Sequence, residues 1–220
     1  MIIRSLIPFI LFWFSGLFSQ ALTPSTHHGS SRDTTYMVRI NRAMPEFIAH
    51  FKMTKLPPDD NIQYLIELRN STDSSLFQSI IDTVNFCWGA HSELIDINCD
   101  GYLDVKLVSG ESPAYADQSY HFWIFDQKEH RYMYNEEFSN IYGDFDVDSV
   151  NKTITCTFRE KCSMCTTQDV YKISNNHPIL IEHQWDEQIG EDDNGVTTVK
   201  TTIERLINGK MTVVKTIMPN

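Results

Sequence analysis

The 220-residue sequence lacks the short motifs that mark several common catalytic sites. It has no Gly-x-Ser-x-Gly nucleophile elbow, no His-Glu-x-x-His zinc motif and no glycine-rich phosphate loop. A cluster of carboxylates occurs at residues 186–194, in Glu187, Glu191, Asp192 and Asp193. A glycosidase needs two carboxylates that face each other across a cleft, which proximity in sequence does not establish. We therefore interpret this cluster as a solvated hairpin loop and expect a protein that is not an enzyme.

Positive charge is also scarce. Lys and Arg number 18 against 29 Asp and Glu, which gives a net charge of −11. A nucleic-acid-binding protein gains most of its affinity from basic side chains that contact phosphates. The composition therefore argues against a nucleic-acid partner, and it favours a basic partner or the binding of cations.

Long apolar runs are absent except at the start of the chain. Arg4 precedes an almost uncharged apolar run at residues 6–18, and Ser19, Gln20 and Ala21 follow it. A positive start, a short apolar core and small residues predict a secretory signal peptide at residues 1–20. We expect a disordered leader at 21–35 and a single β-rich domain at 36–220, with no transmembrane segment in the mature chain. The expected location is the periplasm or the extracellular medium.

Cysteine is rare, but in an exported chain the few present suggest disulfides. The five candidates are Cys87, Cys99, Cys156, Cys162 and Cys165. One interpretation pairs Cys87 with Cys99, and another pairs Cys156 with one of the two later cysteines. Cys162 and Cys165 also form a Cys-x-x-Cys motif, for which a redox or zinc role is the alternative. The connectivity cannot be chosen from sequence.

Helical periodicity is nearly absent after the apolar run, whereas strand patterns recur between short polar turns. Asn208 and Gly209 form the strongest two-residue hairpin signal. The pattern indicates about ten or eleven strands. We predict an all-β fold, an antiparallel meander that is either propeller-like or made of stacked sheets, preceded by a cleaved signal helix. The expected strands are 36–40, 47–53, 62–68, 76–84, 120–125, 131–138, 153–158, 168–173, 179–185, 196–206 and 211–217.

The most specific motif is Asp-Ile-Asn-Cys-Asp-Gly-Tyr-Leu-Asp at residues 96–104. Ca²⁺ binds six to eight oxygens, and a loop supplies them by pointing alternate side chains inward. Gly101 can take the positive φ that reverses the loop. We predict a calcium site whose ligands are Asp96, Asn98, Asp100, the backbone carbonyl of Tyr102, and Asp104.

This loop departs from the helix-loop-helix calcium motif. Leu107 stands where that motif has a bidentate Glu, and apolar and polar residues alternate at 103–107, as in a β-strand. We therefore expect the loop to join strands. The alternative is a turn held by Asx hydrogen bonds without a metal. A second ion site formed by Asp146, Asp148 and Asn151 is also conceivable, although turn chemistry explains those residues equally well.

Several segments resemble a family of bacterial exported proteins with a single calcium loop. They are the loop itself with Val105, then Tyr-His-Phe-Trp-Ile-Phe-Asp at 120–126, Arg-Tyr-Met-Tyr-Asn-Glu-Glu-Phe at 131–138, and residues 145–154. The family is typified by a periplasmic immunity protein that inhibits a lysozyme-like effector of a type IV secretion system. The resemblance covers about residues 75–185 and implies a β-rich, propeller-like fold. The loop alone also resembles the calcium loops of FG-GAP repeats.

The resemblance implies a non-enzymatic, calcium-stabilised binding protein that is exported and acts as an inhibitor or immunity protein. Its implied partner is a peptidoglycan hydrolase with a lysozyme-like fold. Two alternatives are an exported calcium-dependent glycan hydrolase that uses the 186–194 carboxylates, and a structural surface or adhesion protein.

Overall fold

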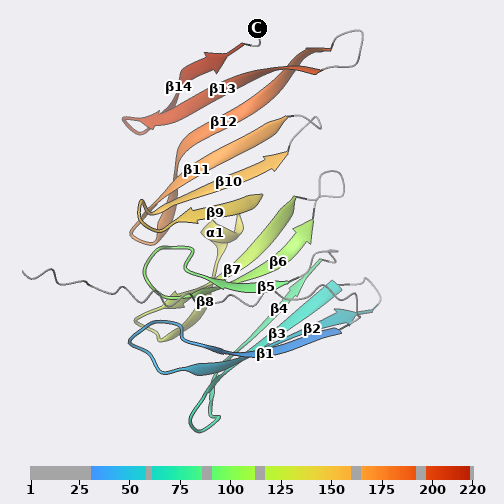
Figure 1. Cartoon of the computed structure of the whole chain (residues 1–220), viewed down its shortest axis with the longest axis vertical. Coiled ribbons are helices and arrows are strands. Elements are labelled where there is room, and N and C mark those ends of the chain that lie inside the picture. The colour runs from blue at the N-terminus through green and yellow to red at the C-terminus, as the bar shows by residue number, and fades with distance from the viewer. Residues whose placement is uncertain are drawn as a thin grey trace, which may run out of the picture.

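The computed structural model describes residues 31–57, 61–85, 91–111, 117–159, 165–191 and 197–218. These residues form fourteen strands and one short helix, and the strands pair in three antiparallel sheets. The all-β prediction is therefore confirmed. The three sheets follow one another along the long axis of the molecule (Figure 1).

Each sheet is a meander of strands that are consecutive in the chain. The first sheet contains β1 (Ser31–Val38), β2 (Phe47–Leu56), β3 (Asn61–Asn70) and β4 (Leu76–Val84). The second contains β5 (Ser92–Ile95), β6 (Asp104–Glu111), β7 (Gln118–Asp126) and β8 (Arg131–Asn135). The third contains β9 (Asp144–Asp148), β10 (Thr153–Arg159), β11 (Thr166–Ser174), β12 (His177–Glu191), β13 (Thr197–Ile207) and β14 (Lys210–Ile217).

Several predicted boundaries are wrong. β5 was expected only as the strand before the 96–104 loop, without bounds, and β9 was not predicted, because five residues carry too little alternation of apolar and polar side chains to stand out. β1 begins at Ser31, inside the predicted disordered leader, because it gains a full ladder of pairs with β2. The predicted strand at 131–138 ends at Asn135, whose side chain accepts a hydrogen bond from the Phe138 N–H and caps helix α1 (Glu136–Ser139).

The hairpin predicted at Asn208 and Gly209 is confirmed. Their φ angles are 52° and 78°, so both central residues of the turn adopt the left-handed region. Asn and Gly tolerate this conformation best, and it gives a two-residue turn the twist that adjacent antiparallel strands need. The turn connects β13 to β14, which pair from Ile207 and Lys210 onward.

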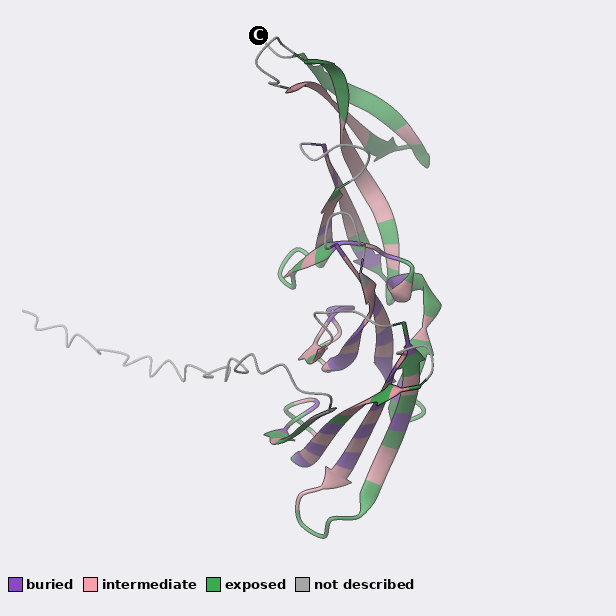
Figure 2. Ribbon diagram, turned by 90° about the vertical axis from the view of Figure 1, so that its right-hand side faces the viewer, coloured by how far each residue is buried: buried purple, intermediate pink, exposed green. Residues whose placement is uncertain are grey.

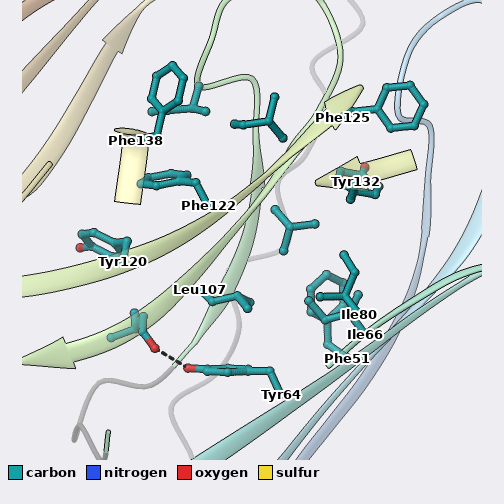
Figure 3. Packing of buried hydrophobic residues seen from close by; sticks show 14 of the residues in the cluster. Phe51, Tyr64, Ile66, Ile80, Leu107, Tyr120, Phe122, Phe125, Tyr132 and Phe138 are labelled. Carbon is teal, nitrogen blue, oxygen red and sulfur yellow. Dashed lines mark hydrogen bonds between the residues drawn. The ribbon is translucent and has the colours of Figure 1, made fainter. Parts of the chain in front are cut away.

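The main core lies between the first two sheets and extends to β9 and β10. Figure 3 shows Phe51, Ile66 and Ile80 of the first sheet facing side chains of the second. The Tyr64 hydroxyl donates a hydrogen bond to the Val108 carbonyl at 3.0 Å, which joins the two sheets. One face of β7 is buried through Tyr120, Phe122 and Ile124. On its other face Phe125 is buried, whereas His121 and Trp123 are half-buried.

The third sheet is covered only at its inner end. Ile154, Cys156 and Ile173 of β10 and β11 belong to the core cluster, which takes no residue from β12, β13 or β14. In Figure 2 these three outer strands are mostly intermediate or exposed and extend away from the core. The inner strands of the third sheet therefore belong to the core, whereas its outer strands contribute no residue to it.

The disulfides predicted for Cys99 and Cys156 are wrong, because both are free, buried thiols. Cys156 lies opposite Asp169 in the β10–β11 hairpin, whereas Cys165 lies at the other end of the hairpin, next to the pair between Arg159 and Thr166. Burial raises the pKa of the Cys156 thiol to about 12. Cys165 is disulfide-bonded. Cys87 and Cys162 lie outside the described residues, as does the predicted signal peptide.

Candidate calcium loop

The predicted calcium loop connects β5 to β6, so the expectation of a strand-to-strand loop is confirmed. Ile95 and Asp104 pair across its base. The loop reverses through two residues with positive φ, Cys99 at 56° and Gly101 at 87°. Leu107, which replaces the closing Glu of a helix-loop-helix site, is a fully buried core residue of β6. Its side chain is needed for packing, which explains why no ligand stands there.

Asp96 and Asp100 hold the loop by accepting hydrogen bonds from its backbone. Asp96 Oδ1 accepts from the Asp100 N–H at 3.0 Å, and its Oδ2 accepts from the Gly101 N–H at 2.9 Å. Asp100 Oδ1 accepts from the Tyr102 N–H at 2.9 Å. The Asp100 contact is that of an Asx turn, whereas Asp96 reaches N–H groups four and five residues further on. Together these contacts fix the position of both carboxylates. Burial raises the pKa of Asp96, with a smaller contribution from the nearby Asp100 carboxylate.

Asp104 connects the loop to the centre of the second sheet. Its Oδ2 accepts a hydrogen bond from the Ile97 N–H at 3.1 Å, and its Oδ1 accepts from the Phe125 N–H of β7 at 2.9 Å. Its exposed fraction is 0%. Burial raises its pKa to about 8, and the charges of Asp100 and Asp96 add to this shift. A carboxylate held in this position gains most from a neighbouring positive charge.

Two further side chains support the loop from outside. The Asn41 Nδ2 donates to the Gly101 carbonyl at 2.6 Å, and the Gln127 Nε2 donates to Asp100 Oδ2 at 3.2 Å. The Tyr102 ring stacks on Phe125 with centroids 5.2 Å apart. Asn41 and Gln127 were not predicted from sequence, because they are distant in the chain and carry no local motif.

The donor set fits a hard cation chemically. It contains three carboxylates, one buried amide at Asn98 and one backbone carbonyl, all oxygens of the kind that Ca²⁺ prefers. Both oxygens of Asp96 and Asp104, and Oδ1 of Asp100, accept one backbone N–H and keep a second lone pair. Asp100 Oδ2 instead accepts from two side-chain amides, Asn98 Nδ2 at 3.0 Å and Gln127 Nε2 at 3.2 Å. Within the described ranges no group of three or more His, Cys, Asp or Glu side chains is gathered as a metal site. An ion would therefore need Asn98 and the Tyr102 carbonyl as well as the three carboxylates.

The possible second ion site at residues 146–151 has the contacts of a turn. Asp148 Oδ1 accepts hydrogen bonds from the Val150 and Asn151 N–H groups at 3.0 and 2.9 Å. Asn151 Nδ2 donates to Asp148 Oδ2 at 2.7 Å. Asp146 lies in β9, where it pairs with Thr155. The arrangement is accounted for by Asx turn chemistry between β9 and β10.

The acidic stretch at 186–194 is a strand for most of its described length, so its interpretation as a loop is wrong there. Residues through Glu191 belong to β12 and pair with β13. Asp186 accepts hydrogen bonds from the hydroxyls of Thr166 and Thr201, and Glu187 forms an ion pair with Lys200. Cross-strand partners stabilise these polar residues within the sheet. Asp192 and Asp193 lie outside the described residues.

A hollow of about 440 Å³ lies beside the calcium loop. Its lining includes Asp100, Gln127, Tyr134 and His177. Asp100 belongs to the calcium loop and also lines the hollow. The contacts that hold Asp100 in the loop therefore also hold this part of the lining of the hollow.

One solved structure gives the comparison that bears on the fold. No family model matches the chain, and no curated protein matches it. The solved structure is described as that of a Xanthomonas type IV secretion system related protein; it is 22% identical, with a TM-score of 0.55. The match covers 84% of this chain and 99% of that one. The two proteins share a fold. Among the described residues, no helix is long and apolar enough to cross a membrane.

Proposed function

We propose that this chain is an exported binding protein, not an enzyme, that binds and inhibits a lysozyme-like cell-wall hydrolase. Support comes from the likeness in fold to a type IV secretion system related protein, which the match covers along nearly the whole length of that protein. Further support comes from the segments around the calcium loop, β7 and β8 that resemble the immunity-protein family. The predicted signal peptide places the binding event in the periplasm or outside the cell.

The observation that carries the calcium part of the proposal is the position of Asp104. Its carboxylate is fully buried, joins the loop to β7 and has Asp96 and Asp100 as charged neighbours. A bound Ca²⁺ ion would supply the positive charge that compensates these three carboxylates. Asp96, Asn98, Asp100, the Tyr102 carbonyl and Asp104 are the residues that would hold it.

The loop would act as a brace and not as a switch. Asp104 and Tyr102 contact β7 through the Phe125 backbone and ring, and Asp100 positions Gln127 after β7. Helix-loop-helix sensors respond to calcium by moving helices apart. Here the elements that flank the loop are paired strands. Fixing them holds the hollow beside Asp100 in one shape, so a partner pays less ordering entropy on binding.

The test is an inhibition assay with a purified lysozyme-fold peptidoglycan hydrolase from a type IV secretion system. We expect the protein to slow the clearing of a peptidoglycan suspension, and we expect Asp100→Ala to weaken this inhibition. Absence of inhibition by the calcium-loaded protein would contradict the proposed partner. The protein is also incubated alone with peptidoglycan, and release of soluble sugar would contradict the non-enzymatic assignment.

A further inference from the structure

The outer edge of the third sheet is an open strand. β14 pairs with β13 on one side, and in the part of the chain that the structure describes no strand pairs with its other side. All its residues except Met211 are exposed. Its exposed side chains include Val213 and Val214, which are 52% and 42% exposed. An unpaired strand with apolar side chains is a template for a further strand.

The register divides β14 into two different faces. Lys210 pairs with Ile207 and Lys215 pairs with Ile203. Ile203 and Ile207 are four residues apart in one strand, so they and their partners point to the same face. The irregularity between Ile203 and Glu204 adds a residue to β14, and it brings the two lysines, five positions apart, onto one face.

The opposite face of β14 carries the apolar side chains of Met211 and Val213, followed by Thr216. Met211 pairs with Leu206, and Val213 pairs with Glu204. Leu206 is 37% exposed. A strand added to this edge would therefore meet lysines on one face and apolar side chains on the other.

β14 is a positively charged strand in a molecule that is acidic overall. It carries Lys210 and Lys215 and no carboxylate, whereas the whole chain has a net charge of −11. A second copy of β14 would bring four lysines together without a carboxylate on either strand. An acidic strand would instead place opposite charges across the new pair, which stabilises a sheet.

We propose that the edge of β14 binds an extended segment of a partner protein in which acidic and apolar residues alternate. The segment adds one strand to the sheet, and its backbone groups pair with the open edge. Its acidic side chains lie beside Lys210 and Lys215, and its apolar side chains lie beside Met211 and Val213. This site goes beyond the proposed function, since it involves neither the calcium loop nor a hydrolase.

The probe is a blocked ten-residue peptide in which valine and glutamate alternate, and its control has lysine in place of glutamate. Binding to the purified protein is measured by fluorescence anisotropy, and the binding site by hydrogen exchange of the β14 amides. Two charge pairs across the new strand should favour the glutamate peptide by about tenfold in Kd. Its binding should slow exchange in β14.

The double variant Lys210→Glu, Lys215→Glu keeps the strand and reverses its charge. Because both positions are exposed, its melting temperature should match that of the unchanged protein. It should prefer the lysine peptide. Equal affinity of the unchanged protein for both peptides would overturn the proposal without reference to the variant. Without added peptide, hydrogen exchange of the β14 amides should not depend on protein concentration. If exchange slowed as the concentration rose, self-association would cover β14, which would overturn the proposal and identify a second copy of the chain as the occupant.

Discussion

The loop-bearing second sheet and the outer half of the third sheet are both antiparallel meanders, yet they are stabilised differently. The second sheet is packed on the first through residues such as Leu107 and Phe125, and Asp104 links its calcium loop to its central strand. The outer third sheet, β12 to β14, contributes nothing to the core cluster. The comparison shows that two sheets of the same topology can differ in packing. A sheet gains most of its stability when one of its faces packs against apolar side chains of other elements.

Two leucines test this comparison with the largest expected effect. Leu107 is fully buried, whereas Leu206 is 37% exposed. Leu107→Ala should lower the free energy of unfolding by about 2–5 kcal/mol, because it removes buried contacts and leaves a cavity. Leu206→Ala should lower it by less than about 1 kcal/mol. Urea unfolding of both variants measures this, and equal losses would show that the outer strands are packed as tightly as the core.

Asp104 tests the link between the loop and β7. Asp104→Ala removes both accepting oxygens, so the Ile97 and Phe125 N–H groups lose their partners. A buried N–H without a partner costs about 1–3 kcal/mol. Asp126 is the matched control, because it also accepts two backbone N–H groups, those of Lys128 and Glu129, but is less buried, at the end of β7 beside an exposed turn.

Both variants are unfolded in urea with a chelator present, so that metal binding does not contribute to the difference. A much smaller loss is expected for Asp126→Ala than for Asp104→Ala. Losses of the same size would mean that burial of Asp104 adds nothing to the strength of its contacts.

Asp82 gives a smaller, pH-dependent test of the contact between the first two sheets. Burial raises its pKa, but hydrogen bonds from His121 and Trp123 outweigh this and hold the pKa below its ordinary value. The resulting stability is present above the unfolded-state pKa of about 4 and is lost as the pH falls through the folded-state value. Thermal melting at pH 7 and pH 3 should show a smaller difference for Asp82→Asn. An unchanged difference would contradict the assignment.

The local features of the fold were predictable from sequence. Alternation identified most strands, and Asn208 and Gly209 identified the last hairpin, because turn chemistry and side-chain period act over a few neighbouring residues. The same reasoning placed the 96–104 loop between strands, since Leu107 cannot be a ligand. The short strand β9 was not predicted, because its pairing with β10 and not its own pattern holds it in place.

The long-range features were not predictable. Nothing near Asp104 indicates that its carboxylate reaches the Phe125 N–H, and nothing near Asp100 indicates Gln127. The acidic residues Glu187 and Glu191 suggested a loop, but β13 pairs with them and offers Lys200 as a counter-charge. Tertiary pairing overrode a composition that disfavours strands. The exposure of strands β12 to β14 was also not predictable. Apolar and polar residues alternate in them as they do in strands that pack on a core.

The central claim is that calcium in the 96–104 loop braces the β scaffold, and a melting curve tests it most directly. The melting temperature of the protein is measured with a chelator and then with Ca²⁺, beside Asp100→Ala. At a Ca²⁺ concentration one hundred times the Kd, binding should add about 2.7 kcal/mol to the free energy of unfolding. We predict a clear rise for the unchanged protein and little or none for the variant. No rise in the unchanged protein would contradict the account.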